Sequence, residues 1–279
     1  MINLLRNILL KSCLASALLL SACGDDEIPP EDRPPDELYK AAEQLLQETD
    51  YVDAAVLFGE VERLYPYSDY AKRAVIMSAF AYQKAGLYEE SRIAAARYLD
   101  FYPADEDAAY AQYLIALSHY DQIDDVSRDQ AVTLDAIRAL RSVGEFYPDS
   151  EYATSAQLKL DLAHDHLAAK EMEIGRYYMK QGHFGAAINR FRVVVEEYET
   201  TSHTPEALHR LVESYLSLGL DDEALIAAAI LGYNFRGSEW YQDSYNLLSD
   251  RNLGTREPDA GATGWLGETY RRVIRGEWL

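Results

Sequence analysis

The chain of 279 residues is poor in cysteine and in basic side chains. Cys13 and Cys23 are its two cysteines, and 26 lysines and arginines stand against 47 aspartates and glutamates, for a formal net charge of −21. This deficit argues against a nucleic-acid-binding protein, which needs basic residues to neutralise phosphates. It also argues against a polybasic protein of the membrane surface. Apolar residues still make up 48% of the chain, which is enough for a folded core.

Motifs that carry catalysis are also missing. The sequence contains no Gly-x-Ser-x-Gly elbow, no phosphate-binding loop and no Gly-x-Gly-x-x-Gly fingerprint. His164 and His166 are two residues apart, and on a helix such side chains point about 200° apart, so they cannot bind one metal ion together. We therefore expect a protein that is not an enzyme, with no metal site and no catalytic cofactor.

Residues 1–22 have the features of a cleaved signal peptide. They combine a basic start with an apolar stretch from Leu14 to Leu20, which is shorter than the about 20 residues of a membrane span. The run Leu20-Ser21-Ala22-Cys23 resembles the lipobox of bacterial lipoproteins. This resemblance implies cleavage before Cys23 and attachment of a diacylglycerol and an N-acyl chain to Cys23. The alternative is an ordinary signal peptide with a chance cysteine.

Cleavage at this point would change the chemistry of the chain. Loss of Arg6 and Lys11 shifts the formal net charge from −21 to −23. Loss of Cys13 and acylation of Cys23 together leave no thiol for a disulfide, a metal site or a nucleophile. Gly24 follows the cysteine, and by resemblance to the sorting rule of Gram-negative lipoproteins this implies the outer membrane, with the body lipid-anchored on its periplasmic face. Residues 23–35 are acidic and proline-rich, which is typical of an extended tether.

From residue 36 to residue 250 the chain is marked at regular intervals. Proline cannot continue a helix, and apolar stretches with helical spacing end at Tyr65-Pro66, Tyr102-Pro103 and Tyr147-Pro148, with Tyr198-Glu199 as a degenerate fourth mark. Between these marks a tyrosine, a glycine and a small residue recur four and five residues apart. The triplets are Tyr82, Gly86 and Ser91; Tyr178, Gly182 and Ala187; and Tyr215, Gly219 and Ala224.

This pattern resembles the tetratricopeptide repeat, a helix–turn–helix unit of about 34 residues. It predicts an all-α fold, a right-handed superhelical solenoid of about five units over residues 36–250, in which each glycine closes a helix. In the first unit, Asp50 is expected to replace the turn glycine and Ala55 to be the small residue. In the fourth unit, Gly175 is expected where two helices approach each other closely. An unrelated helical bundle is the alternative. The units are Asp36–Tyr65, Ser68–Tyr102, Asp105–Tyr147 with an inserted polar loop around Asp121–Gln130, Ser150–Tyr198 with an unusually long first helix, and Thr204–Tyr233.

Three further segments follow the repeats. Residues 238–250 are predicted to form a helix that covers the last apolar face of the solenoid. Residues 251–264 are rich in glycine and are expected to be a linker. Residues 265–279 are amphipathic and locally basic. They are interpreted either as an element for a partner or a membrane surface, or as a helix folded back onto the solenoid.

An ordered series of local runs resembles one family, the BamD (ComL) tetratricopeptide lipoproteins of the outer-membrane β-barrel assembly machinery. The runs are Pro34-Pro35-Asp36-Glu37-Leu38-Tyr39, Arg63-Leu64-Tyr65-Pro66-Tyr67-Ser68, Ser127-Arg128-Asp129, Phe146-Tyr147-Pro148-Asp149-Ser150-Glu151-Tyr152, Tyr177-Tyr178 with Gly182, Asn189-Arg190, Gly232-Tyr233-Asn234 and Ser238-Glu239-Trp240-Tyr241.

This resemblance implies a non-enzymatic scaffold. The C-terminal repeats of the family dock onto periplasmic domains of the barrel-forming subunit, other accessory lipoproteins join the complex, and the N-terminal repeats receive unfolded outer-membrane proteins. Arg190 matches a family arginine at the barrel-subunit contact, and Ser127, Arg128 and Asp129 are assigned to partner binding in the same way. The family often has a basic residue just before the turn glycine. In this chain Gln181 stands there, with Lys180 one place earlier.

Tyrosine is abundant, with 22 residues against 7 phenylalanines. Because a tyrosine ring has an apolar body and a polar tip, tyrosines on a concave surface could hold an extended peptide. We hypothesise a substrate groove lined by Tyr67, Tyr70, Tyr98, Tyr110 and Tyr113, against the alternative that these residues pack the repeats. A rival function is a periplasmic tetratricopeptide lipoprotein that coordinates cell-wall synthesis or division. A repeat-bearing enzyme is disfavoured because no catalytic domain fits into the remaining chain.

Overall fold

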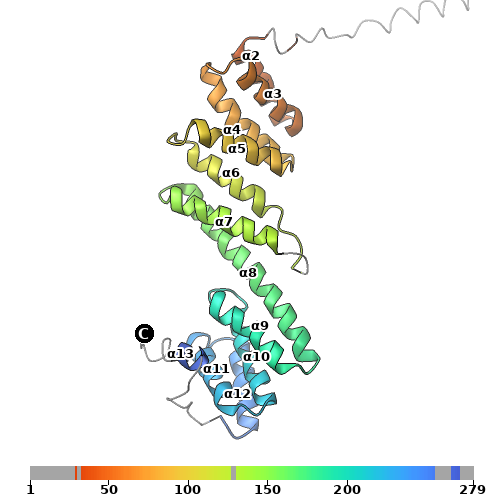
Figure 1. Ribbon diagram of the computed structural model, residues 1–279, viewed down its shortest axis with the longest axis vertical. Helices are drawn as coiled ribbons and strands as arrows, with labels where there is room; N and C mark the ends of the chain where they lie inside the picture. Colours follow the sequence, from red (N-terminus) through yellow and green to blue (C-terminus); the bar gives the residue numbers. More distant parts are fainter. Residues whose placement is uncertain (1–28, 30–32, 127–129, 255–264, 271–279) are drawn as a thin grey trace, which may run out of the picture. The chain divides into compact units, whose positions relative to one another are not determined.

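The protein is described by a computed structural model that covers residue 29 and residues 33–126, 130–254 and 265–270 (Figure 1). These residues form twelve α-helices and no β-strand. The chain divides into two compact units, Met1–Tyr98 and Leu99–Leu279, which are considered separately. Within the described ranges, no helix is both long and apolar enough to cross a membrane.

The expected all-α class and the five helix–turn–helix pairs are confirmed. The pairs are α2 (Pro35–Gln47) with α3 (Tyr51–Leu64), α4 (Asp69–Lys84) with α5 (Tyr88–Phe101), α6 (Ala108–Tyr120) with α7 (Ala131–Phe146), α8 (Glu151–Lys180) with α9 (Phe184–Glu197), and α10 (Thr204–Ser217) with α11 (Asp221–Asn234). Two helices follow them, α12 (Glu239–Asp250) and α13 (Trp265–Tyr270).

The turns inside the second, fourth and fifth pairs share one backbone geometry. Gly86, Gly182 and Gly219 have φ angles of 74°, 77° and 74°, the left-handed region that a Cβ disfavours. In each turn the residue after the glycine donates its N–H to the carbonyl of the triplet tyrosine, as in Leu87 to Tyr82 at 3.0 Å. This six-residue closure is the Schellman motif of helix C-termini, and it explains why the sequence repeats glycine at these points.

In the first pair the turn residue is Thr49, and the expectation for Asp50 was wrong. Thr49 has a φ of 66°, and Asp50, with a φ of −85°, begins α3 as its N-cap and donates its N–H to Leu45 at 2.9 Å. Ala54 therefore corresponds to the small residue of the other triplets. Because a β-branched residue is rare in the left-handed region, nothing in the residue type indicated that Thr49 would occupy it.

The left-handed threonine leads to a stability prediction. Thr49 is exposed, and its Cβ costs roughly 1–2 kcal/mol in the left-handed region. A glycine there would remove this cost at the expense of a more flexible unfolded chain. We expect Thr49→Gly to raise the free energy of unfolding by about 0.5–1 kcal/mol. Gly86→Thr, at the matching turn of the second pair, should lower it by about 1–2 kcal/mol. Urea titration of both variants checks this, and a less stable Thr49→Gly would contradict it.

The junctions between pairs also repeat. The C-cap residues of helices α3, α7, α9 and α11 are Tyr65, Tyr147, Tyr198 and Phe235, whose φ angles are −131°, −133°, −132° and −134°. Each of these residues accepts a backbone N–H from three residues further on, for example from Ser68 to Tyr65 at 3.0 Å. Ser150 and Ser238 then begin the next helices, and their Oγ atoms accept the N–H of Ala153 and Tyr241, both at 3.2 Å. Ser150 was expected to begin a helix, and this is confirmed.

The first unit packs around a fully buried aromatic side chain on α3. Phe58 contacts Tyr39 of α2 edge-on, with 5.2 Å between ring centroids, and Tyr39 contacts Tyr70 of α4 at 5.3 Å. Small residues line the helix crossings, and their backbone is hydrogen-bonded by hydroxyls from the next helix. Ser78 donates to the carbonyl of Ala55 at 3.0 Å, and Ser91 to that of Ala79 at 2.9 Å. These bonds satisfy buried polar groups where helices lie close together.

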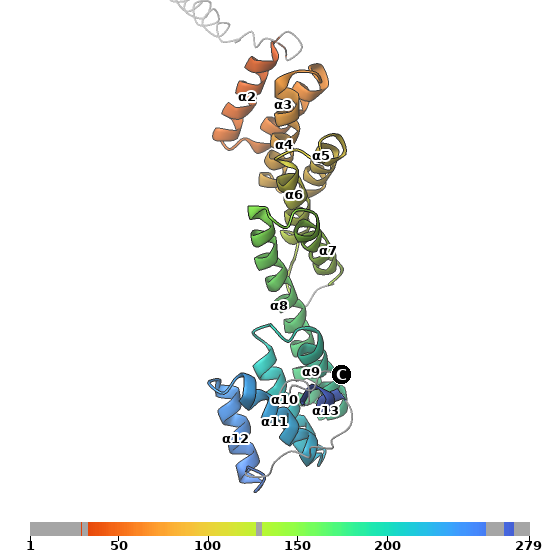
Figure 2. The ribbon, with the colours of Figure 1, turned by 90° about the vertical axis from the view of Figure 1, so that its left-hand side faces the viewer.

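The second unit is organised by α8, which has 30 residues, as the sequence indicated. Its part up to Leu167 packs with α6 and α7 through residues such as Leu160 and Leu167. Its C-terminal half joins the core of the later helices through Ala168 and Met172. Helix α9 packs directly against α8, and helices α10 to α13 pack in turn on α9 and on one another (Figure 2). A Cβ added at Gly175 would lie 2.4 Å from the ring of Phe191 on α9, which confirms the expected close approach.

The C-terminal helices complete this unit. Helix α12 packs against α10 and α11, as expected of a terminal covering helix. Helix α13 folds back onto the repeats: Leu266 is 4% exposed, and the Trp265 ring lies 5.0 Å from the Arg192 guanidinium and hydrogen-bonds Tyr215. For residues 265–270 the structure therefore supports the folded-back alternative over a free amphipathic element. Residues 271–279 lie outside the described residues.

Candidate partner-binding surfaces

Arg190 lies on α9, at the edge of an open cavity of about 310 Å³. Its Nη1 is 3.1 Å from the Glu171 carboxylate of α8, and the arginine side chain remains 41% exposed. Tyr178, Ala186, Asn189 and Val193 form the rest of the lining. Since a guanidinium has five donors in a fixed fork, Arg190 can pair with Glu171 and still offer donors to a carboxylate of another protein.

An aromatic pair borders this cavity. Tyr177 is 62% exposed, and its ring meets that of Tyr178 edge-on at 5.8 Å between centroids. Lys180 and Gln181 end the same helix, and both are exposed. The cavity lining therefore combines an arginine, an amide and the partly buried Tyr178, with the exposed Tyr177 beside it. Arginine and tyrosine are the residue types that dominate the energetics of protein–protein contacts.

The other residues assigned to partners or lipid lie outside the described residues. Ser127, Arg128 and Asp129 fall in the undescribed part of the loop between α6 and α7. Cys23 lies in the undescribed N-terminal segment. Their roles stay predictions.

The five tyrosines of the predicted groove have different environments. Tyr98 is 0% exposed and belongs to the core, so its expected place in an accessible groove is corrected. Tyr70 packs on Tyr39. Tyr110 and Tyr113 both contact the ring of Tyr152, at 5.1 and 5.5 Å between centroids. Burial, reinforced by Tyr152, raises the pKa of Tyr110 well above its ordinary value, so its hydroxyl stays protonated. Tyr67 is fully exposed.

The first unit has a groove that sequence reasoning missed. A cavity of about 610 Å³ lies between α3 and α5, with Ser78 and Tyr82 of α4 among its lining residues. Val56 and Ile93 line it and are 51% and 55% exposed. Charged residues also line it, and the Arg97 guanidinium lies 2.8 Å from the Glu62 carboxylate. The sequence signal that could have indicated this groove is Val56 and Ile93, two apolar residues outside the apolar faces that pack the cores of their helices. Neither residue belongs to the tyrosine–glycine–small-residue triplets, so the repeat pattern did not point to them.

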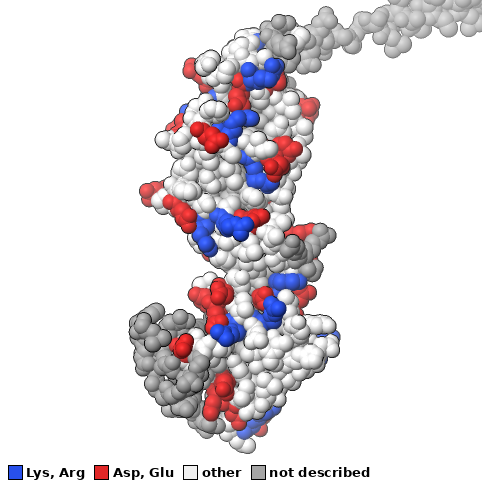
Figure 3. Space-filling view, in the orientation of Figure 1, with Lys and Arg blue, Asp and Glu red and all other residues white. Residues whose placement is uncertain are grey.

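Charged side chains over the visible face occur in small groups of both signs (Figure 3). Many of the ion pairs in the described residues join side chains three or four residues apart on one helix, such as Arg63 with Glu60 and Arg192 with Glu196. Exposed pairs of this kind contribute only about 0.3–0.5 kcal/mol each. Among the described residues, no group of three or more His, Cys, Asp or Glu side chains is placed to hold a metal ion.

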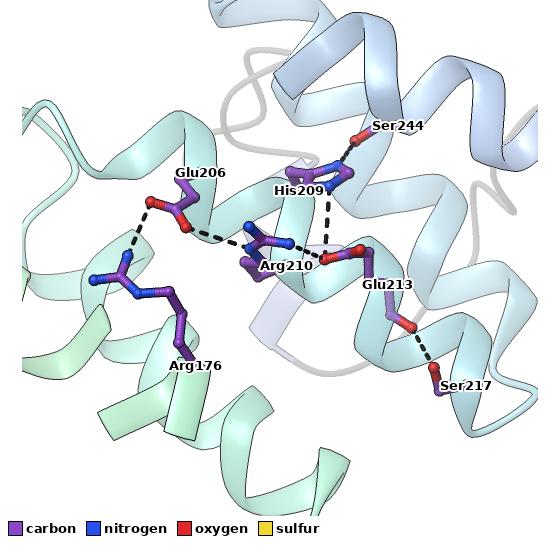
Figure 4. A network of polar contacts seen from close by, with 7 residues as sticks. All are labelled: Arg176, Glu206, His209, Arg210, Glu213, Ser217 and Ser244. Atoms are coloured by element: carbon purple, nitrogen blue, oxygen red, sulfur yellow. Dashed lines mark hydrogen bonds and ion pairs between the residues drawn. The ribbon is translucent and has the colours of Figure 1, made fainter. Parts of the chain in front are cut away.

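A polar network joins α8, α10 and α12 (Figure 4). Arg176 of α8 pairs with Glu206 at 3.0 Å, and Arg210 pairs with Glu206 at 3.3 Å and with Glu213 at 2.7 Å. The same guanidinium lies 5.2 Å above the Trp240 ring of α12. The network fixes the three helices relative to one another.

His209 is the titratable group that this network buries. It is 5% exposed, its Nδ1 is 2.8 Å from the Ser244 hydroxyl, and its ring lies 5.4 Å from that of Trp240. Its Nε2 is 3.6 Å from the Glu213 carboxylate. Burial lowers the pKa of His209, and the acidic neighbours Glu213, Asp243 and Glu206 only partly oppose this shift.

This shift predicts a pH-dependent stability. The unfolded chain binds a proton on His209 with the ordinary pKa of about 6.5, whereas the folded chain binds it only at lower pH. The folded state should therefore lose stability as the pH falls below about 6.5. Urea unfolding followed by tryptophan fluorescence at pH 7.5 and 5.5 measures the loss. His209→Gln should show a smaller loss, and an unchanged loss in this variant would contradict the prediction.

Known proteins are similar to this chain in sequence. The sequence profile of the YfiO family, described as an outer membrane lipoprotein, matches residues 31–229. This span is more than half of the chain and includes both the groove between α3 and α5 and the Arg190 cavity. The chain belongs to the BamD (YfiO) family.

Curated relatives agree with this assignment. The outer membrane protein assembly factor BamD of Caulobacter vibrioides is 48% identical over 223 residues, which are 80% of this chain and 73% of the relative. BamD of Rickettsia prowazekii is 42% identical over 213 residues, 76% of this chain and 85% of the relative. The family profile ends within α11, so α12 and α13 lie beyond its match.

Proposed function

We propose that this chain is a non-enzymatic outer-membrane protein assembly factor, held by lipid on Cys23 at the periplasmic face of the outer membrane. The observation that supports this most is its 48% identity to an outer membrane protein assembly factor over 80% of the chain. The fold suits the role, because stacked helix pairs present long surfaces to partners without a catalytic centre. Its partners are proteins and the lipid leaflet, and no nucleic acid is involved.

The Arg190 cavity is proposed as the docking point for the barrel-forming subunit of the machinery. Arg190, Asn189 and the Tyr177–Tyr178 pair suit a partner surface that presents a carboxylate beside apolar side chains. Other accessory lipoproteins would join the same complex. Purification from outer membrane with the lipid anchor intact tests this proposal. Recovery of a large barrel protein with periplasmic repeats is expected, and recovery of cell-wall-linked partners alone would favour the rival function.

The groove between α3 and α5 is proposed to receive unfolded outer-membrane proteins. Val56 and Ile93 offer apolar contacts to side chains of an extended peptide, and Tyr82 adds a ring with a polar tip. This proposal moves the substrate surface away from Tyr98, which is buried. Tyr67 keeps its predicted substrate role as an exposed residue.

A photo-crosslinking residue at Ile93 tests the groove. Pulse-labelled nascent barrel proteins should crosslink at Ile93, and substitution of Val56 by serine should reduce the yield. A crosslinker at Val52, which is 46% exposed on α3 and does not line the groove, serves as the matched control. Equal yields at Ile93 and Val52 would contradict the proposal.

A further inference from the structure

Two exposed leucines stand side by side on the N-terminal half of α8. Leu158 and Leu162 are 64% and 59% exposed, and residues four apart lie on the same face of a helix. Their neighbours Leu160 and Ala163 are buried and account for the packing of this part of α8. The two leucines are therefore not needed for the core. Adjacent large apolar side chains left in water mark interaction sites.

The surface around these leucines is hollowed on both sides. Leu162 lines a cavity of about 280 Å³ together with Tyr120 and Ile123, where α6 passes into its loop. It also lines a second cavity of about 710 Å³, which it shares with Leu158 and with residues 200–202 of the α9–α10 loop. We call this area the α8 surface: Leu158 and Leu162, bounded by residues 120–124 on one side and 200–202 on the other.

Side chains hold both borders in place. The Asp165 carboxylate of α8 accepts the N–H and the hydroxyl of Ser202 at 3.0 and 2.7 Å, and it lies 3.4 Å from Nε2 of His203. On the other border the Lys159 ammonium lies 4.6 Å from the centre of the Tyr120 ring. The α8 surface is thus preformed, so a partner would not have to order these loops on binding.

Charge indicates which partner the α8 surface fits. Asp121 and Asp124 line the first cavity, and Asp161 and Asp165 line the second. Of the lining residues that the structure describes, none is a lysine or an arginine, and the one cation named on the border, Lys159, lies over the Tyr120 ring. Because complementary charge selects partners and suppresses wrong ones, an acidic rim around an apolar centre favours a basic segment. The formal net charge of −21 disfavours a second copy of this chain as that partner.

We propose that the α8 surface is a second docking site, for a partner-protein segment that places an apolar side chain between Leu158 and Leu162 and carries lysine or arginine on either side of it. This site uses none of the residues of the Arg190 cavity or of the groove between α3 and α5. It therefore adds a partner contact to the proposed function and can fail independently of it.

Site-specific crosslinking in cells tests the proposal. A photo-crosslinking residue replaces Leu158 in the full-length lipidated protein, and mass spectrometry then identifies the crosslinked segment. Leu218 provides the control position, because it is 47% exposed. It is the C-cap of α10, about 20 Å along the helix from the α9–α10 loop that borders the α8 surface. Asp161→Lys, one turn from Leu158, is the charge-reversal variant.

The proposal expects one partner segment at Leu158, with at least two lysines or arginines near its crosslinked apolar residue. The yield should fall at least fivefold with Asp161→Lys, while co-purification of the barrel-forming subunit stays unchanged. The proposal is overturned by a yield no higher than at Leu218, by a segment without basic residues, or by a yield that Asp161→Lys does not change. A crosslink to lipid, to a second copy, or to residues 271–279 of the same chain would overturn it too.

Discussion

Replacing Arg190 with glutamate should weaken binding of the barrel-forming subunit at least tenfold, which corresponds to about 1.4 kcal/mol. The substitution removes the donors that the cavity offers to a partner carboxylate and puts a negative charge in their place. It also places that charge beside Glu171, whose carboxylate lies 3.1 Å from the arginine. Binding of the purified lipidated protein to the detergent-solubilised subunit, followed by biolayer interferometry, measures the change.

The control for this experiment is Arg138→Glu. Arg138 is an exposed arginine on α7 that pairs with Asp135 of its own helix, so the change in charge is the same at a site away from the cavity. It should leave binding within a factor of two. Glu171→Gln should bind at least as tightly as the wild type, because it releases Arg190 from its internal partner. Equal weakening by the Arg190 and Arg138 variants would show that net charge, not the cavity, governs docking.

Replacing Gly175 with alanine should destabilise the second unit. The added Cβ would lie 2.4 Å from Cε1 of Phe191, and the Phe191 ring is fully buried and cannot turn away. Overpacking of this kind costs about 1–3 kcal/mol. The better helix propensity of alanine returns at most about 1 kcal/mol. We expect a net loss of about 1–2 kcal/mol in the free energy of unfolding, seen as a lower urea midpoint for helix loss.

Gly144→Ala separates packing from helix propensity. Gly144 is an exposed residue in α7, and a Cβ there would meet no atom within 4 Å. This variant should gain up to about 1 kcal/mol. If Gly175→Ala were as stable as Gly144→Ala, then α8 and α9 would not approach as closely as the structure shows.

The helices were predictable from sequence because their ends carry chemical marks. Tyrosine-proline pairs mark the ends of helices, and the glycines of the triplets mark left-handed turns, so most helix bounds could be read within a few residues. The long α8 was readable because no proline interrupts residues 151–180. Each of these signals depends only on residues that are neighbours in the sequence. Helix ends and turns can therefore be predicted from a single sequence.

The predictions from sequence were wrong or open where contacts between distant parts of the chain determine the conformation or the burial of a residue. Thr49 takes the left-handed turn position because the Schellman closure between α2 and α3 holds it there, although its side chain disfavours that conformation. Tyr98 was placed in a groove, yet its residue type is common both in cores and on binding surfaces, and only packing shows that it is buried. The docking of α13 depends on Arg192 and Tyr215, far away in the sequence.

The same limit explains the surfaces that the sequence did not reveal. Leu158, Leu160 and Leu162 are the same residue type at alternate positions, yet only Leu160 is buried. A helix that packs with different partners along its two halves has no single apolar stripe, so periodicity cannot separate core leucines from exposed ones. Val56 and Ile93 lie on different helices and form one groove only in the folded unit.

Depletion of this protein in its own cells tests the central claim most directly. The proposed function predicts that folded β-barrel proteins, measured as heat-modifiable species in the outer membrane, fall within a few generations. Unfolded barrel proteins should accumulate in the periplasm, and expression of the wild-type chain should restore assembly where a chain with Arg190→Glu does not. Normal amounts of folded barrel protein, together with a defect in cell-wall synthesis or division, would contradict the proposed function.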